Sequence, residues 1–98
     1  MKQANKCADM QDIRAEIDRI DETIIMLLGE RFGYVKAAAK FKKTTEDVSA
    51  PERFRAMLHQ RRLWAKAQGL SEEMIEKLYR DLVEYFISRE LTEWANQR

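Results

Sequence analysis

The sequence has few of the residues that interrupt helices or build tightly constrained sites. Its 98 residues include three glycines, one proline, one cysteine and one histidine. A lone cysteine excludes an intrachain disulfide, and one cysteine with one histidine cannot supply a Cys/His zinc set. A Gly-rich phosphate loop, a serine or cysteine nucleophile placed with histidine, and a cluster of carboxylates are also missing from the sequence. We therefore expect a protein that works without a cofactor or a metal.

A large net charge and a long apolar run are missing as well. The 18 Lys and Arg residues and 17 Asp and Glu residues leave a net charge of +1, and the two signs alternate along the chain. This pattern is typical of solvated helix faces and lacks the basic excess of a nucleic-acid-binding surface. The longest apolar run, residues 23–28, is far below the ~20 residues needed to span a bilayer, and no signal-like leader precedes it. We expect a cytoplasmic protein with no nucleic-acid or membrane partner.

Apolar residues recur at helical spacing, and no segment alternates as a strand would. We predict a single all-α domain over residues 1–98, with residues 1–8 flexible and Cys7 without a role. The first helix begins at Asp9 and Asp12 and continues to about Phe41. Its apolar stripe consists of Ile13, Ile17, Ile20, Ile24 and Leu27 or Leu28.

Two shorter helices follow a polar segment, residues 43–50, that we predict to be a loop. The run Ser49-Ala50-Pro51-Glu52 has the pattern of a capping box with proline in the first turn, and opens a helix to about Gln68. Gly69 and Leu70 predict a helix stop. Ser71-Glu72-Glu73 then predicts the start of a third helix.

The first helix is too long for the other two to cover. About thirty residues at a rise of 1.5 Å give a rod of about 45 Å. Helices of about 18 and 25 residues that must also cover each other leave part of its apolar stripe bare. An intertwined homodimer is the physical expectation, while a loosely packed monomer and a larger coiled-coil assembly stay open.

Three charged residues fall on faces that should be apolar. At about 100° per residue, Arg31 lies on the stripe of the first helix, and Lys42 is turned only about 20° from it. Such cations extend their heads into water, pair with an anion or bind an anionic ligand, because an unpaired buried charge is costly. Glu90 should face inward on the third helix, either in an ion pair with Arg31 or Lys42 or against a ligand. Arg14, at the border of the stripe, would be a surface residue by spacing alone.

The order of these residues resembles the all-helical chorismate mutase family, and within it the isochorismate pyruvate lyase branch that makes salicylate for siderophores. The resemblance covers nearly the whole chain, from about residue 12 to residue 94. It rests on an ordered set of motifs: Asp12-Ile13-Arg14, Ile17-Asp18-Arg19-Ile20-Asp21, Leu28-Gly29-Glu30-Arg31, Tyr34-Val35-Lys36, Phe41-Lys42, Pro51-Glu52-Arg53 and Met57-Leu58.

The resemblance implies a site for a small dicarboxylate, isochorismate or chorismate. Arg14, Arg31 and Lys42 match the substrate-binding cations of the family, and Glu90 occupies the position of a polar residue that is usually glutamine. Lys42 and Glu90 would be the catalytic residues, with Lys42 near the ether oxygen of the breaking C–O bond. The family fold is an intertwined homodimer in which each site takes an arginine from the opposite chain. Its reactions are pericyclic and need no cofactor.

The resemblance favours the lyase, which would eliminate pyruvate from isochorismate. Val48 and Pro51 stand where bacterial mutases of the family carry acidic and basic residues, Phe86 replaces a small hydroxyl residue, and the connecting loop is shorter. Glu90 resembles some fungal mutases, so rearrangement of chorismate to prephenate, as main or side activity, is the alternative. A second alternative is a non-catalytic helical domain whose charged stripe binds a partner protein.

Overall fold

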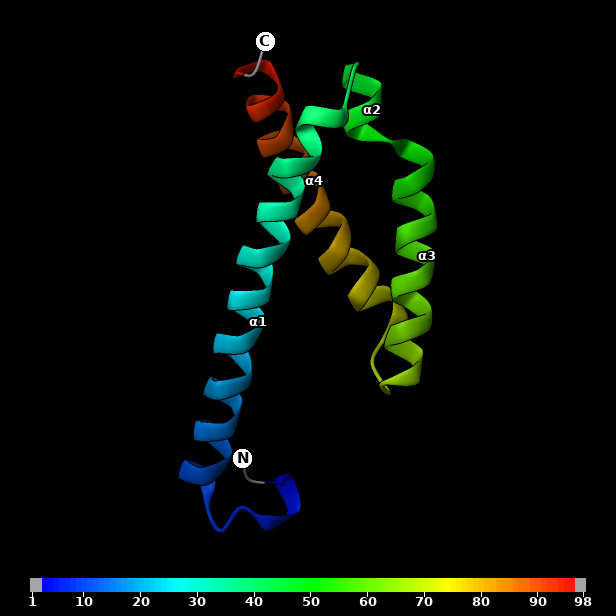
Figure 1. Ribbon diagram of the computed structural model, residues 1–98. Helices are drawn as coiled ribbons and strands as arrows, with labels where there is room; N and C mark the ends of the chain where they lie inside the picture. The colour runs from blue at the N-terminus through cyan, green and yellow to red at the C-terminus, as the bar shows by residue number, and fades with distance from the viewer. Residues whose placement is uncertain (1–2, 97–98) are drawn as a thin grey trace. The chain divides into compact units, whose positions relative to one another are not determined.

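The computed structural model describes residues 3–96, and all regular structure in this range is helical (Figure 1). The elements are the 3₁₀ turns η1 (Ala4–Lys6) and η2 (Ala39–Phe41) and the helices α1 (Met10–Ala38), α2 (Thr45–Ser49), α3 (Pro51–Ala67) and α4 (Glu72–Asn96). The predicted all-α class is confirmed for the described residues, with one more short helix than expected. The chain divides into two compact units, Met1–Tyr34 and Val35–Arg98, which are described separately.

The first unit begins α1 where the sequence predicted. The Asp9 carboxylate accepts a hydrogen bond from the Asp12 N–H at 2.9 Å, and the Asp12 carboxylate accepts one from the Ala8 N–H at 2.9 Å. These two reciprocal bonds satisfy backbone donors that a helix start leaves unpaired, and place negative charge at the positive end of the helix dipole. Of the segment expected to be flexible, Ala4–Lys6 forms a 3₁₀ turn, and residues 1 and 2 lie outside the described residues.

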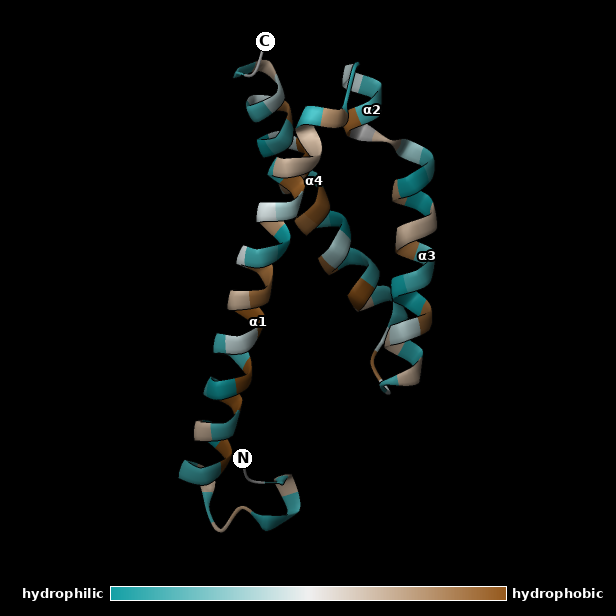
Figure 2. Ribbon diagram, in the orientation of Figure 1, coloured by the Kyte–Doolittle hydropathy of each residue, from teal (hydrophilic) through white to brown (hydrophobic). Residues whose placement is uncertain are grey.

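The predicted apolar stripe of α1 is present in the first unit. None of the 29 residues of α1 is buried. Figure 2 shows hydrophobic positions recurring along α1 among hydrophilic ones. The large side chains of the stripe are about half exposed: Ile17 at 49%, Ile20 at 45%, Ile24 at 48% and Leu27 at 56%. A row of apolar side chains of this length marks an interaction surface.

The second unit contains the end of α1, which differs from the prediction in one respect. The α-helix gives way to η2 after Ala38, and Lys42 caps it in an extended conformation (φ −90°, ψ 139°) with its N–H bonded to Ala39 O. The predicted end near Phe41 is confirmed. However, placing Lys42 on the stripe by counting 100° per residue is wrong, because the helical rotation stops before Lys42.

The segment predicted to be a loop instead holds α2. The Thr44 hydroxyl accepts from the Asp47 N–H at 3.1 Å, and the Asp47 carboxylate accepts from the N–H groups of Thr44 and Lys43 at 3.2 and 3.0 Å. This is a complete capping box. A five-residue helix is unstable alone, and the buried side chain of Val48 anchors it to the core.

The prediction that Ser49 is the N-cap of α3 is also wrong, and the Ser49 side chain that the predicted capping box needs lies outside what the structure describes. The N-cap is Ala50, and no side chain of the described residues caps this end, although Pro51 does open the helix as expected. Because α2 continues through Ser49, Ala50 alone connects the two helices and takes a left-handed conformation with φ of 40°. This conformation is unusual for a residue with a side chain, so the joint is strained.

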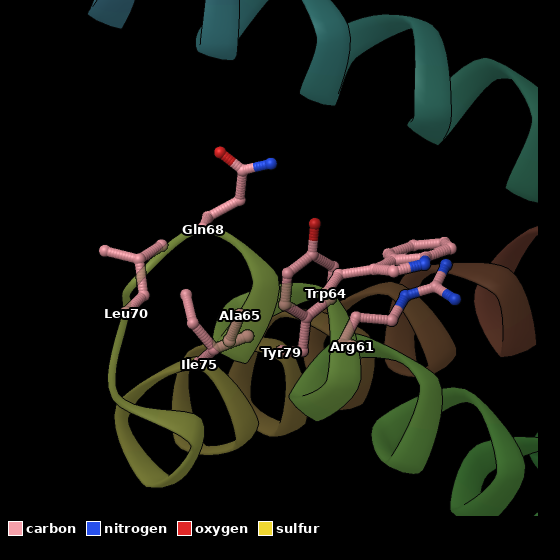
Figure 3. A pocket seen from close by; sticks show the side chains of 7 residues that line it. All are labelled: Arg61, Trp64, Ala65, Gln68, Leu70, Ile75 and Tyr79. Carbon is pink, nitrogen blue, oxygen red and sulfur yellow. The ribbon is translucent and has the colours of Figure 1, made fainter.

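The corner between α3 and α4 follows the sequence prediction. Gly69 adopts a φ of +73°, and the N–H groups of Gly69 and Leu70 bond to the carbonyls of Lys66 and Ala65 at 3.1 and 2.9 Å. This is a Schellman motif, and Figure 3 shows Leu70 at the corner with Ala65. The Ser71 hydroxyl accepts from the Met74 N–H at 3.1 Å and so caps α4.

Helix α4 organises the second unit by packing against α3, α2 and η2. Near its start, Glu76 accepts a hydrogen bond from Arg62 of α3 at 3.1 Å. The described core consists of Ala39, Val48, Met57, Leu58, Ala65 and Phe86. Since α4 is held by α3 at one end and by η2 and α2 further along, its later turns lie beside Lys42.

Candidate active site

Lys42 and Glu90 are the two predicted site residues that the second unit brings together. The Lys42 ammonium lies 3.7 Å from the Glu90 carboxylate and donates a hydrogen bond to the backbone carbonyl of Asp47 at 2.9 Å. Glu90 is only 6% exposed, so the prediction that it faces inward is confirmed. Of the two ion-pair partners that the sequence allowed, the structure shows Lys42. The pair combines a half-buried cation with a buried carboxyl group.

The Glu90 carboxyl group is buried in surroundings that, among the described residues, leave one of its oxygen atoms without a hydrogen bond. Its Oε2 atom is buried and accepts no hydrogen bond from the residues that the structure describes. Burial raises the pKa of Glu90 above its ordinary value, and the positive charge of the nearby Lys42 ammonium opposes this increase only in part. The group therefore holds a proton more readily than an exposed glutamate. When protonated, it can donate a hydrogen bond to an oxygen atom of a ligand.

Trp94 also contacts Lys42, and our sequence interpretation gave it no role. Its indole N–H donates a hydrogen bond to the backbone carbonyl of Lys42 at 2.8 Å. Trp94 is four residues after Glu90 on α4 and so shares a face with it, but the bond to Lys42 joins residues 52 positions apart. Periodicity alone does not predict such a pairing.

Asp47 is a second residue that sequence reasoning missed. Its carboxylate is turned toward the N–H groups of Lys43 and Thr44, and these bonds, the one from Lys43 foremost, lower the pKa of Asp47. Its carbonyl oxygen accepts the bond from the Lys42 ammonium. The sequence signal was present, because Thr44 and Asp47 have the spacing of a capping box.

The other two predicted cations lie on α1 in the first unit. Arg14 is exposed and Arg31 is half-buried. The two residues are 17 positions apart on one continuous helix, which separates them by about 25 Å along its axis. Both side chains of a single chain therefore cannot contact one small substrate.

Val48 and Phe86, which the sequence associated with lyase rather than mutase chemistry, are both buried. Val48 lies on α2 and Phe86 on α4, one turn before Glu90. A carboxylate or hydroxyl group at either position would lose its hydration, which is costly without a partner. Pro51, the third such position, is exposed at the start of α3.

Two surface hollows of the second unit lie apart from the Lys42–Glu90 pair. One, of about 150 Å³, lies at the α3–α4 corner, where the Arg61 guanidinium is 4.7 Å from the Trp64 ring centre and 5.7 Å from that of Tyr79 (Figure 3). The other, of about 290 Å³, is lined by Pro51, Phe54, Arg55, Arg80, Glu84 and Ile87. Neither includes Lys42 or Glu90.

Within residues 3–96, no group of three or more His, Cys, Asp and Glu side chains is placed to hold a metal ion. No helix in that range is both long enough and apolar enough to cross a membrane.

Comparison with known proteins identifies the class of this protein. Residues 13–91 match the family model of chorismate mutase type II, and the chain belongs to this family. The predicted family is thus confirmed. Over all 98 residues the chain is 40% identical to an isochorismate pyruvate lyase of Pseudomonas aeruginosa, of which it covers 97%. It is also 39% identical over 72 residues to the T-protein of Haemophilus influenzae, a match that covers 72% of this chain and 19% of that protein.

Proposed function

We propose that this protein is an isochorismate pyruvate lyase that converts isochorismate to salicylate and pyruvate. The observation that carries the proposal is the pairing of half-buried Lys42 with buried Glu90, which offers a cation and a carboxyl group able to hydrogen-bond to a polar ligand. The full-length similarity to a lyase supports isochorismate as the substrate. The apolar residues Val48 and Phe86 support it as well, because the resemblance described above implies polar residues at these two positions in mutases of the family.

The proposed reaction is a cofactor-free pericyclic elimination. The C–O bond between the ring and the enolpyruvyl group breaks while a ring hydrogen moves to the enolpyruvyl methylene carbon, which yields pyruvate and an aromatic ring. Negative charge develops on the ether oxygen as the bond breaks, and the Lys42 ammonium would stabilise it. Glu90 would hydrogen-bond to the substrate, while Arg14 and Arg31 would bind its carboxylates. No nucleophile or general base is needed.

We also propose that the functional unit is an intertwined homodimer whose sites are shared between chains. The exposed apolar stripe of α1 requires a covering surface, and a second copy of α1 offers a stripe of the same kind. The distance of about 25 Å between Arg14 and Arg31 adds a chemical reason, since one of them must come from the partner to reach the same substrate. In this proposal residues 1–98 form one catalytic domain, active in the cytoplasm.

Isochorismate is expected to be the better substrate. The purified protein is incubated separately with isochorismate and chorismate, and salicylate fluorescence is compared with prephenate formation. We expect kcat/KM for isochorismate to exceed that for chorismate by at least about tenfold, or about 1.4 kcal/mol of transition-state stabilisation. A tenfold preference for chorismate would instead assign the protein to the mutases, which the Glu residue at position 90 also allows. Absence of both activities would favour an interaction domain.

Two inactive variants are expected to regain enzymatic activity when they are combined in one dimer. Refolding Arg14→Ala chains together with Arg31→Ala chains should give heterodimers with one intact site and one site that lacks both arginines. Random pairing makes half of the dimers heterodimers, so roughly a quarter of the sites should be intact and activity should recover to about that level. Each variant refolded alone serves as the control. Demonstrated heterodimers without recovery would show that each site is built within a single chain.

A further inference from the structure

We propose that Trp94 is a positioning residue that holds the backbone of Lys42 while Glu90 faces its ammonium group. In this arrangement α4 contacts both ends of Lys42, the backbone carbonyl through Trp94 and the ammonium through Glu90. The inference rests on the proposed role of Lys42 at the ether oxygen of the substrate. It assigns to the last turns of α4 a function in catalysis that goes beyond their contribution to the core.

The geometry places both contacts on one face of α4. Glu90 and Trp94 are four residues apart, so their side chains project from consecutive turns in the same direction. The Glu90 carboxylate lies 3.7 Å from the Lys42 ammonium, and the Trp94 indole N–H donates to the Lys42 carbonyl at 2.8 Å. Helix α4 therefore contacts Lys42 at its backbone carbonyl and at its ammonium, which also donates to the Asp47 carbonyl on α2.

Lys42 needs such support because of its place in the chain. It lies just after η2, where its backbone has left the helix, and it precedes the residues that turn into α2. The Lys42 N–H bonds to Ala39 O at 3.2 Å, whereas its carbonyl oxygen is held by Trp94. The two bonds fix the peptide groups on either side of the Cα atom. The long side chain then extends from a defined origin to the carbonyl of Asp47.

Loss of the indole bond would let the Lys42 backbone move and carry the ammonium with it. Electrostatic stabilisation of a transition state depends on a charge that is already in place, and a displacement of about 1 Å can cost on the order of 100-fold in rate. Substrate binding relies on Arg14 and Arg31 in addition, so it should suffer less. The signature of a positioning role is therefore a loss in kcat.

The test is Trp94→Phe, which keeps an aromatic ring and removes the indole donor. We expect kcat on the substrate that the wild type turns over to fall about tenfold while KM changes less than about twofold. Trp64→Phe makes the same chemical change on α3, in a residue that is 54% exposed and lies in the hollow at the α3–α4 corner. This control should keep kcat within about twofold of the wild type.

A double-mutant cycle separates positioning from a general effect on the fold. If Trp94 acts through Lys42, then Trp94→Phe should lower kcat by less than about twofold in a Lys42→Ala background, because the group that it positions is gone. A tenfold loss that persists in that background would overturn the proposal. So would a wild-type kcat in the single variant.

An NMR titration of the free protein tests the contact between Trp94 and Lys42 even if the proposed function is wrong. Among the described groups, burial and the Lys42 ammonium set the pKa of Glu90, since the Asp47 carboxylate is turned to backbone N–H groups. Carboxyl ¹³C NMR titration should show a higher pKa of Glu90 in Trp94→Phe, because the opposing charge moves away. An unchanged pKa would overturn the positioning role. If the wild type turns over neither isochorismate nor chorismate, the proposed function falls and this titration decides the role of Trp94 alone.

Discussion

Replacing Lys42 with alanine is expected to lower kcat/KM for isochorismate by about 10² to 10³-fold, or about 2.7 to 4 kcal/mol, the range typical of a preorganised donor that stabilises developing charge. Most of the loss should fall on kcat, because the ammonium interacts more strongly with the ether oxygen as its charge grows. Steady-state kinetics over a range of substrate concentrations separates the two parameters.

The neighbouring Lys40 provides the matched control for this change. Its side chain lies over the exposed ring of Phe41, with the ammonium 5.3 Å from the ring centre, and it belongs to the same turn that precedes Lys42. Lys40→Ala removes the same charge from the chain and should leave kcat/KM within about twofold. Near-normal turnover by Lys42→Ala would refute the role of Lys42 at the ether oxygen.

Turnover by the wild type is expected to decline at alkaline pH, whereas turnover by the Glu90→Gln variant should stay constant. The buried carboxyl group has a raised pKa in the free protein, and a dianionic substrate beside it should raise the pKa further. Glutamate can donate a hydrogen bond only when protonated, so turnover should fall about tenfold per pH unit above its pKa in the complex. The glutamine side chain can donate a hydrogen bond at any pH, so turnover by the Glu90→Gln variant should not change over the same pH range.

If turnover by the wild type and by Glu90→Gln depends on pH in the same way, and chemistry is shown to be rate-limiting, then Glu90 does not act as a proton-dependent hydrogen-bond donor. The ion pair with Lys42 would then be structural. Single-turnover measurements at each pH exclude product inhibition and slow product release as causes of the pH dependence.

The stability of the free protein provides an independent check on the same group. A carboxyl group whose pKa is raised on folding favours the folded state fully below the unfolded pKa of about 4.5, and this contribution is lost as pH rises through the folded pKa. Glutamine does not titrate. The Tm of the Glu90→Gln protein should therefore rise relative to the wild type from about pH 4.5 upward, and level off above the pKa of Glu90.

Local motifs were the part of the fold that the sequence predicted best. The Asp9–Asp12 start of α1, the Gly69–Leu70 stop and the Ser71 cap each depend on side chain and backbone groups within five residues of one another. Such bonds form wherever the residue types and spacing allow them. The inward position of Glu90 followed from the helical period in the same way.

The errors arose where long-range contacts override local patterns. Residues 43–50 are polar and gave no periodic signal, yet the buried side chain of Val48 holds α2 in place. Because α2 extends through Ser49, the cap predicted there for α3 moved to Ala50. Lys42 was placed by extending a helix past its end, and its contacts with Glu90 and Trp94 span about half of the chain. The sequence allowed Lys42 as one of two ion-pair partners of Glu90, and only the folded chain selects it and reveals the contact with Trp94.

The bare surface of α1 has a consequence for how this protein folds. None of the 29 residues of α1 is fully buried, and most helical stability in proteins comes from packing of an amphipathic face rather than from helical propensity. In the proposed homodimer, the free energy that orders α1 comes from contacts with a second copy. With a second copy as that source, folding and association become one bimolecular step, and dilution unfolds the protein as heat does. In that dimer the melting temperature depends on protein concentration, because α1 folds only as two chains associate.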